Sequence, residues 1–122
     1  MSSQPIEQHP ARHGEPLIPM PPLTEQALRV AVSTIDLAAA VRFETEFHAA
    51  WQEAVQMDST VPMHTFLHRW GVFVALHRYP MRAARLDELE HEVALAETVD
   101  AAREASAEIA VLLDTARREV LG

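Results

Sequence analysis

The stretch from Val61 to Pro80, VPMHTFLHRWGVFVALHRYP, most constrains what this chain can fold into. Pro62 suits the first turn of a helix, where the N–H that proline lacks has no partner to lose, and Pro80 is expected to end that helix. Val72 and Leu76 form one apolar face, and the opposite face carries Met63, Phe66, Leu67, Trp70, Phe73, Val74 and His77 at helical spacing. Because a helix that is apolar on two sides is buried, we predict that this segment is the central helix of the fold.

The composition of the chain excludes several classes of protein. Its 122 residues are enough for one domain, its formal net charge is −8, and it has no cysteine. An acidic chain is poorly suited to nucleic-acid backbones and anionic membranes, and without cysteine there is no thiolate metal site or thiol nucleophile. No stretch has the pattern of a signal peptide or a membrane span. We therefore expect a soluble, cytoplasmic protein without a membrane partner.

Residues 1–22 hold six of the eight prolines. Such a segment buries too little apolar surface to offset its chain entropy, so we predict a disordered Pro-rich tail. The alternative is a strap that orders on a partner, with Leu17, Ile18 and Met20 as its anchors.

Residues 23–122 are predicted to form a helical domain. Thr24 is a good N-cap for a short helix over about Glu25–Ser33, and an amphipathic helix follows over about Leu37–Met57. After Pro80 a break near residues 98–100 would divide the chain into two helices, and one continuous helix feeding a dimer is the alternative. We predict an all-α bundle of four long helices plus a short N-terminal helix, which pairs as a homodimer. The expected core residues are Phe47, Trp51, Phe66, Trp70, Phe73, Leu89, Val93, Ile109 and Leu112.

The histidines and carboxylates form no complete catalytic or metal-binding pattern. His64 and His68 have the spacing of a zinc-binding pair but lack a third ligand. Glu88 and His91 match half of a di-iron motif that needs a second such unit. His77 lies within an apolar face and is interpreted as a structural core residue. We expect no metal, no cofactor and no enzymatic activity.

Charge is distributed unevenly along the chain. Residues 59–86 contain no acid, whereas residues 87–100 contain six acids and no arginine. The two patches either pair within the fold or form a bipolar surface that steers a protein partner. The candidate partner-binding residues are Leu17, Ile18, Met20, Arg78, Arg82, Arg85, Asp87 and Glu88, with the acids up to Glu92.

Several short motifs resemble a family of short actinobacterial helical proteins of unknown function. The motifs are Phe43-Glu44-x-Glu46-Phe47, Val61-Pro62, Phe66-x-x-Arg69-Trp70-Gly71-Val72 and Pro80 followed by Arg85-Leu86. Some members are encoded near small toxins of the RelE/ParE type, so the resemblance implies an antitoxin-like or toxin-associated partner.

Three functions remain open from the sequence. The first is a non-enzymatic protein-interaction module that binds a protein partner such as a small basic toxin. The second is a dimeric DNA-associated regulator, which requires the arginines of residues 59–86 to be exposed. The third is a small ligand-binding sensor or enzyme centred on His77, which requires a pocket beside Trp70 and Phe73.

Overall fold

The computed structural model describes residues 14–121, and the chain is all-α as predicted. The described residues form five helices and no strand. The helices are α2 (Glu25–Ile35), α3 (Leu37–Met57), α4 (Val61–His77), α5 (Pro80–Leu95) and α6 (Val99–Leu121).

Side-chain caps and prolines set the helix boundaries. Thr24 Oγ1 accepts a hydrogen bond from the N–H of Ala27 at 3.1 Å, which confirms the predicted cap of α2. Thr98 Oγ1 caps α6 in the same way, at 3.0 Å from the N–H of Ala101, so the segment after Pro80 is two helices. The central helix ends at His77, before Pro80, and Pro80 itself lies in the first turn of α5.

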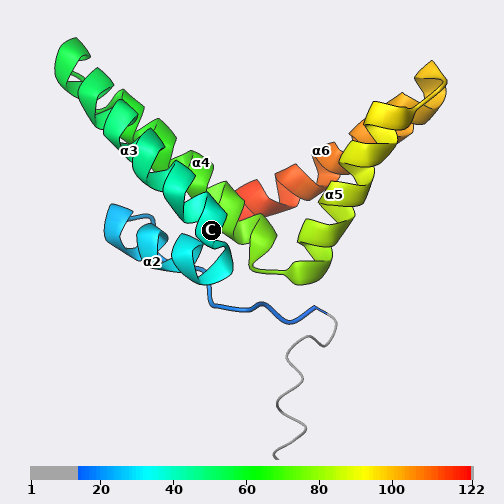
Figure 1. Ribbon diagram of the computed structural model, residues 1–122, viewed down its shortest axis with the longest axis horizontal. Coiled ribbons are helices and arrows are strands. Elements are labelled where there is room, and N and C mark those ends of the chain that lie inside the picture. The colour runs from blue at the N-terminus through cyan, green and yellow to red at the C-terminus, as the bar shows by residue number, and fades with distance from the viewer. Residues whose placement is uncertain (1–13, 122) are drawn as a thin grey trace, which may run out of the picture.

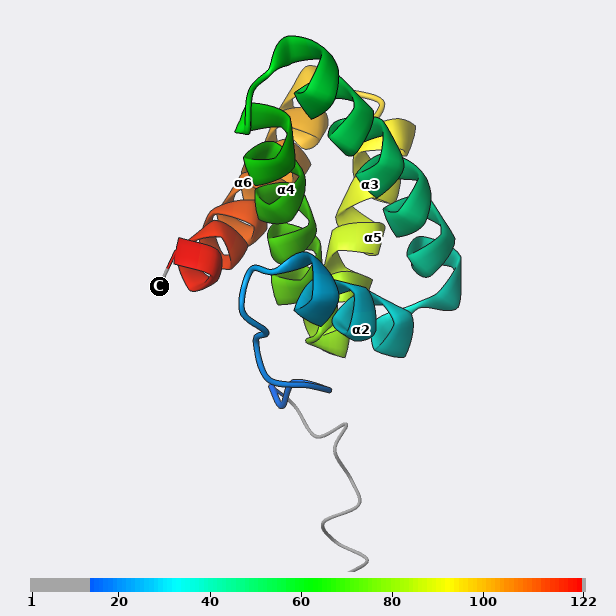
Figure 2. The ribbon, with the colours of Figure 1, turned by 90° about the vertical axis from the view of Figure 1, so that its left-hand side faces the viewer.

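The helices form a V of two arms (Figure 1). One arm pairs α3 with α4, and the other pairs α5 with α6; we call them the α3/α4 arm and the α5/α6 arm. Helix α2 lies across the base of the first arm, where it packs on both α3 and α4 (Figure 2). The arms are joined because α6 and the start of α5 pack against α4, whereas α3 does not pack against α5 or α6.

The main core lies where α2, α3 and α4 meet. Phe43 has its ring centroid 5.0 Å from that of Phe66 and 5.2 Å from that of Trp70, and both pairs meet edge to face, which aromatic rings prefer. Phe66, Trp70 and Leu89 are buried as predicted, and the partly buried members of the expected core are Phe47, Phe73, Val93, Ile109 and Leu112.

Trp51 is the exception to the predicted core, because 53% of its surface is exposed. It lies in the C-terminal half of α3, on the flank of the apolar face, whereas α2 lies at the base of that arm in Figure 2. Helical spacing identified the right face of α3 but not where the neighbouring helix lies.

A smaller core joins the two arms. Ala75 and Leu76 of α4 pack with Ala116 of α6. A Cβ at Gly71 would lie 2.6 Å from Leu23 Cδ2, so a larger residue there would force Leu23 to shift, whereas Val120 at 3.5 Å would stay in ordinary contact. The end of α6 therefore lies directly against the central helix.

The prediction of disorder up to Pro22 is wrong for residues 14–22, which we call the strap. The N–H of Leu17 donates to the carbonyl of Arg78 at 2.6 Å, and Ile18 and Met20 pack against the core. These apolar contacts offset the entropy of ordering, which is lower for a proline-rich segment because proline restricts the unfolded chain. The remainder of the predicted tail, residues 1–13, lies outside the described residues.

Candidate functional site

Five of the residues predicted to bind a partner lie where the strap, α4, α5 and α6 meet; they are Leu17, Ile18, Met20, Arg78 and Arg82. We call Arg78, Tyr79, Arg82 and Glu119 the junction cluster. Arg78 donates to Glu119 at 3.0 Å and to the carbonyl of Ile18 at 3.3 Å. Arg82 contacts the other carboxylate oxygen of Glu119 at 2.6 Å, and both guanidinium groups lie over the ring of Tyr79. Both arginines therefore form ion pairs within the chain.

Glu119 is ionised at neutral pH. Burial raises the pKa of its carboxyl, but the hydrogen bonds from Arg82 and Arg78 outweigh burial, so the net pKa lies below the ordinary value. Arg78 is itself buried, and its Nε has no partner within the described residues. A buried guanidinium held by a single carboxylate fixes how α4 meets α6.

The strap residues contribute unequally to the surface. Ile18 and Met20 are half-buried and pack inward, whereas the side chain of Leu17 is exposed. Of the three predicted anchors, Leu17 alone faces outward.

The remaining predicted contact residues lie on the α5/α6 arm. Arg85 donates to Glu108 at 2.8 Å and to Glu88 at 2.9 Å, and these bonds raise the pKa of its guanidinium. Asp87 is exposed, and its carbonyl accepts a hydrogen bond from His91, which raises the pKa of that imidazole. Thus Arg85 and Glu88 are engaged with each other, and the carboxylate of Asp87 lies 3.9 Å from Nδ1 of His91.

A groove of about 480 Å³ lies near the tip of this arm, between α5 and α6. Its lining combines small and apolar side chains with four glutamates. We call it the acidic groove; it is lined by His91, Glu92, Leu95, Ala96, Glu97, Ala101, Glu104, Ala105 and Glu108.

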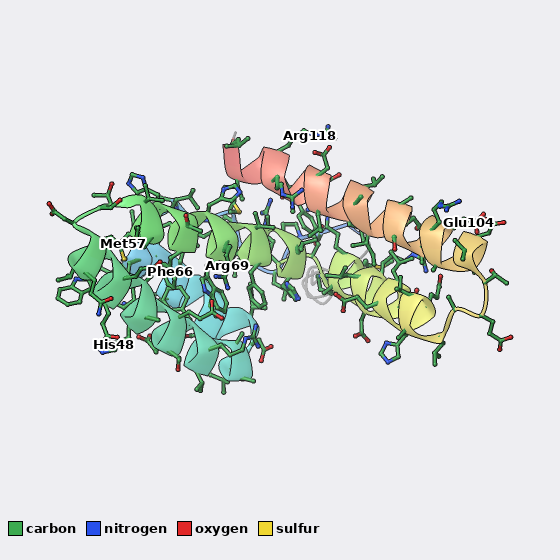
Figure 3. All side chains as sticks on the ribbon, turned by 90° about the horizontal axis from the view of Figure 1, so that it is seen from above. His48, Met57, Phe66, Arg69, Glu104 and Arg118 are labelled. Atoms are coloured by element: carbon green, nitrogen blue, oxygen red, sulfur yellow. The ribbon has the colours of Figure 1, made fainter. Side chains whose placement is uncertain are left out.

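A second cavity, of about 310 Å³, lies between α3, α4 and α6 and has the opposite charge. We call it the arginine pocket; it is lined by Arg42, Glu46, His68, Arg69, Trp70, Val72, Phe73 and Arg117. Figure 3, seen from above, shows Arg69 between α3 and α4. Sequence reasoning required a pocket beside Trp70 and Phe73 for a ligand sensor, and this pocket occupies that place.

The cations of the arginine pocket were missed from the sequence because spacing gives a misleading signal. Glu46 follows Arg42 by one helical turn, but Arg69 and Trp70 take its carboxylate instead. Likewise Asp114 precedes Arg117 by one turn but pairs with Arg118, which projects from the outer edge of α6 in Figure 3.

His77 does not line this pocket. Its ring stacks on Phe73 with centroids 4.0 Å apart, and its Nδ1 donates to the carbonyl of Phe73 at 2.9 Å. The carbonyl only accepts, so this bond fixes the tautomer and gives the imidazole a structural role. Across residues 14–121 no three His, Asp or Glu side chains are grouped so that they could hold a metal ion.

No family model, curated protein or solved structure matches the chain. The resemblance to the actinobacterial family therefore stays a prediction. Within the described residues, every helix is too short or too polar to cross a membrane.

Proposed function

We propose that this protein is a non-enzymatic protein-interaction module whose α5/α6 arm binds a basic protein. The observation that carries the proposal is the concentration of charge on that arm. Between Leu86 and Glu108 there are eight carboxylates and one arginine, an excess of seven negative charges, compared with eight for the whole chain. All eight of these residues are exposed.

The shape of the arm supports the same proposal. The acidic groove combines apolar side chains with carboxylates, a combination that complements a long basic side chain that has an apolar stem and a cationic end. Leu95 and Val99 remain exposed beside it at the tip of the arm. Electrostatic steering brings a basic partner to such a surface, and the apolar contacts then hold it.

A small basic toxin, the partner implied by the family resemblance, has the required chemistry, so an antitoxin-like role is part of this proposal. The DNA-associated alternative is not favoured. It requires an exposed basic stretch, but Arg78, Arg82 and Arg85 donate to carboxylates of the same chain. A homodimer covering the tip of the α5/α6 arm would use the same exposed residues. Light scattering of the purified protein measures its oligomeric state and so distinguishes a homodimer from a monomer that binds another protein.

The test is a pull-down from the native host with charge-reversed variants. Glu97 and Glu104 line the acidic groove, and Glu15 and Glu53 are exposed acids elsewhere. The Glu97→Lys, Glu104→Lys variant should lose a basic partner that the wild type captures. The control variant Glu15→Lys, Glu53→Lys changes the net charge by the same amount and should still capture the partner.

Capture should also weaken as salt is raised, because the attraction is screened. The proposal would be overturned if both double variants captured the basic partner equally, or if the amount captured did not change with salt concentration.

A further inference from the structure

Within residues 14–121, two arginines lack a carboxylate partner, and both line the arginine pocket. Of the nine arginines in the described residues, seven have a carboxylate oxygen within 4.0 Å. Arg42 and Arg117 have none within the same residues, although the chain is strongly acidic. Their coincidence in one cavity, brought about by two helices distant in sequence, indicates a site for an anion.

The one carboxylate in the pocket is already engaged. Glu46 accepts a hydrogen bond from Arg69 at 2.7 Å and from the indole N–H of Trp70 at 3.0 Å. These bonds hold Arg69 in place. The pocket therefore contains one carboxylate and three guanidinium groups, those of Arg42, Arg69 and Arg117. A ligand must therefore supply the missing negative charge.

The wall of the pocket is aromatic. Trp70 and Phe73 have ring centroids 5.0 Å apart, and the guanidinium of Arg42 lies 5.6 Å and 5.9 Å from those centroids. Val72 completes the apolar lining. Flat apolar groups pack well against such surfaces.

We propose that the arginine pocket binds a small aromatic anion, meaning a single ring that bears a carboxylate or a phosphate. The ring packs against the partly exposed Phe73, beside the buried Trp70, and the oxyanion accepts hydrogen bonds from Arg42 and Arg117, whose planar guanidinium groups match either anion. The volume of about 310 Å³ is at the lower end of ligand pockets, roughly 300–1,000 Å³, so the ligand is small. This site is separate from the acidic groove and does not depend on the function proposed for it.

Trp70 provides the readout. The chain has two tryptophans, so a Trp51→Phe background leaves Trp70 as the only indole. Benzoate and phenyl phosphate are the probes, benzamide is the neutral analogue of benzoate, and inorganic phosphate lacks the ring. We expect a saturable change in Trp70 fluorescence with benzoate, phenyl phosphate or both, and the stronger of the two identifies the preferred oxyanion.

The two control compounds should bind at least about tenfold more weakly, because each lacks one half of the recognised chemistry. If benzamide bound as tightly as benzoate, the pocket would not require a charge on the ligand. If inorganic phosphate bound as tightly as phenyl phosphate, the pocket would not require a ring. No saturable change with any probe would overturn the proposal altogether.

Variants of the two free arginines test the assignment. Arg42→Gln and Arg117→Gln should each weaken binding of the preferred probe by roughly 10- to 100-fold, the cost of losing a charge-assisted hydrogen bond. Arg118→Gln is the matched control, because it removes the same charge from the neighbouring position on the outer edge of α6. Circular dichroism confirms that all three variants are folded, and equal affinities across them would overturn the assignment.

The acidic arm of a second copy is the competing occupant. In that case Trp70 emission would change with protein concentration in the absence of any probe, and Arg42→Gln would abolish the change. Such a result would overturn the small-molecule proposal.

Discussion

The two arms of the V are built from similar lengths of helix but are held together in different ways. The α3/α4 arm has a third helix, α2, at its base, and the three helices enclose the rings of Phe43, Phe66 and Trp70. In the α5/α6 arm, α4 packs against α6 only at the junction, where Ala116 is buried, and the other buried apolar residues of the arm are Leu89 and Ala105. An arm two helices thick cannot bury both sides of either helix, so we expect the first arm to provide most of the stability of the fold, whereas the second leaves open the surface that we propose binds a partner.

Substituting Trp70 should have the largest effect, because it removes the centre of the aromatic core. We expect Trp70→Ala to cost about 3–5 kcal/mol of the free energy of unfolding, as large truncations in cores do. Trp51→Ala is the matched control and should stay within about 0.5 kcal/mol, because that side chain is exposed. Urea denaturation measures both values. Comparable losses for the two tryptophans would contradict the placement of the core.

Leu89→Ala tests the α5/α6 arm in the same way. Leu89 is fully buried, and we expect a loss of about 2–3 kcal/mol, because a two-helix arm collapses around the cavity more readily than the aromatic core does. The loss should be local. Amide exchange should accelerate in α5 and the first half of α6 before it does in α3 and α4.

The exposed Leu95 is the control, and Leu95→Ala should leave exchange unchanged. Uniform acceleration throughout the chain in Leu89→Ala would show that the arms unfold as one unit.

Features set by neighbouring residues could be predicted from the sequence. The cap of α2 at Thr24 and the break between α5 and α6 at Thr98 depend on side chains that bond to backbone three residues away. Features set by the placement of distant helices could not. The exposure of Trp51 depends on where α2 lies, and the order of the strap depends on Arg78, some sixty residues later.

The same limit applies to the candidate sites. The acidic segment is visible in the sequence because its acidic residues lie close together along the chain, and in the fold they are exposed on the α5/α6 arm. The arginine pocket is invisible because Arg42 and Arg117 come from different arms and each has a carboxylate one turn away that another group uses. Recognising it requires knowing which pairs form.

The junction between the arms should respond to acid. The carboxyl of Glu119 has a lowered pKa in the folded state through Arg82 and Arg78, so its contribution to stability is complete above the ordinary value of 4.5 and is lost as the pH falls below it. We expect Glu119→Gln to cost about 1.5–3 kcal/mol at pH 7, the value of hydrogen bonds to a charged group.

The difference between Glu119→Gln and the wild type should shrink toward zero as the pH falls from 4.5 through the lowered pKa of the folded state, because the wild type then becomes protonated as well. Thermal unfolding across the range from pH 3 to 7 measures it. A difference that stays constant with pH would mean that the junction does not depend on the charge of Glu119.

Substituting Arg85 should have the smallest effect, although it forms the most ion pairs. Its guanidinium lies 2.8 Å from Glu108, 2.9 Å from Glu88 and 3.6 Å from Glu92, but exposed pairs contribute little because water and salt screen them. Arg85→Gln should lower the melting temperature slightly in about 0.01 M salt and not at all in 1 M salt, where the Debye length falls from about 30 Å to about 3 Å. A loss that persists in 1 M salt would mean that Arg85 stabilises the arm through packing of its side chain rather than through ion pairs, which that salt screens. Because the variant also removes a positive charge beside the acidic groove, it should bind the proposed basic partner more tightly at low salt.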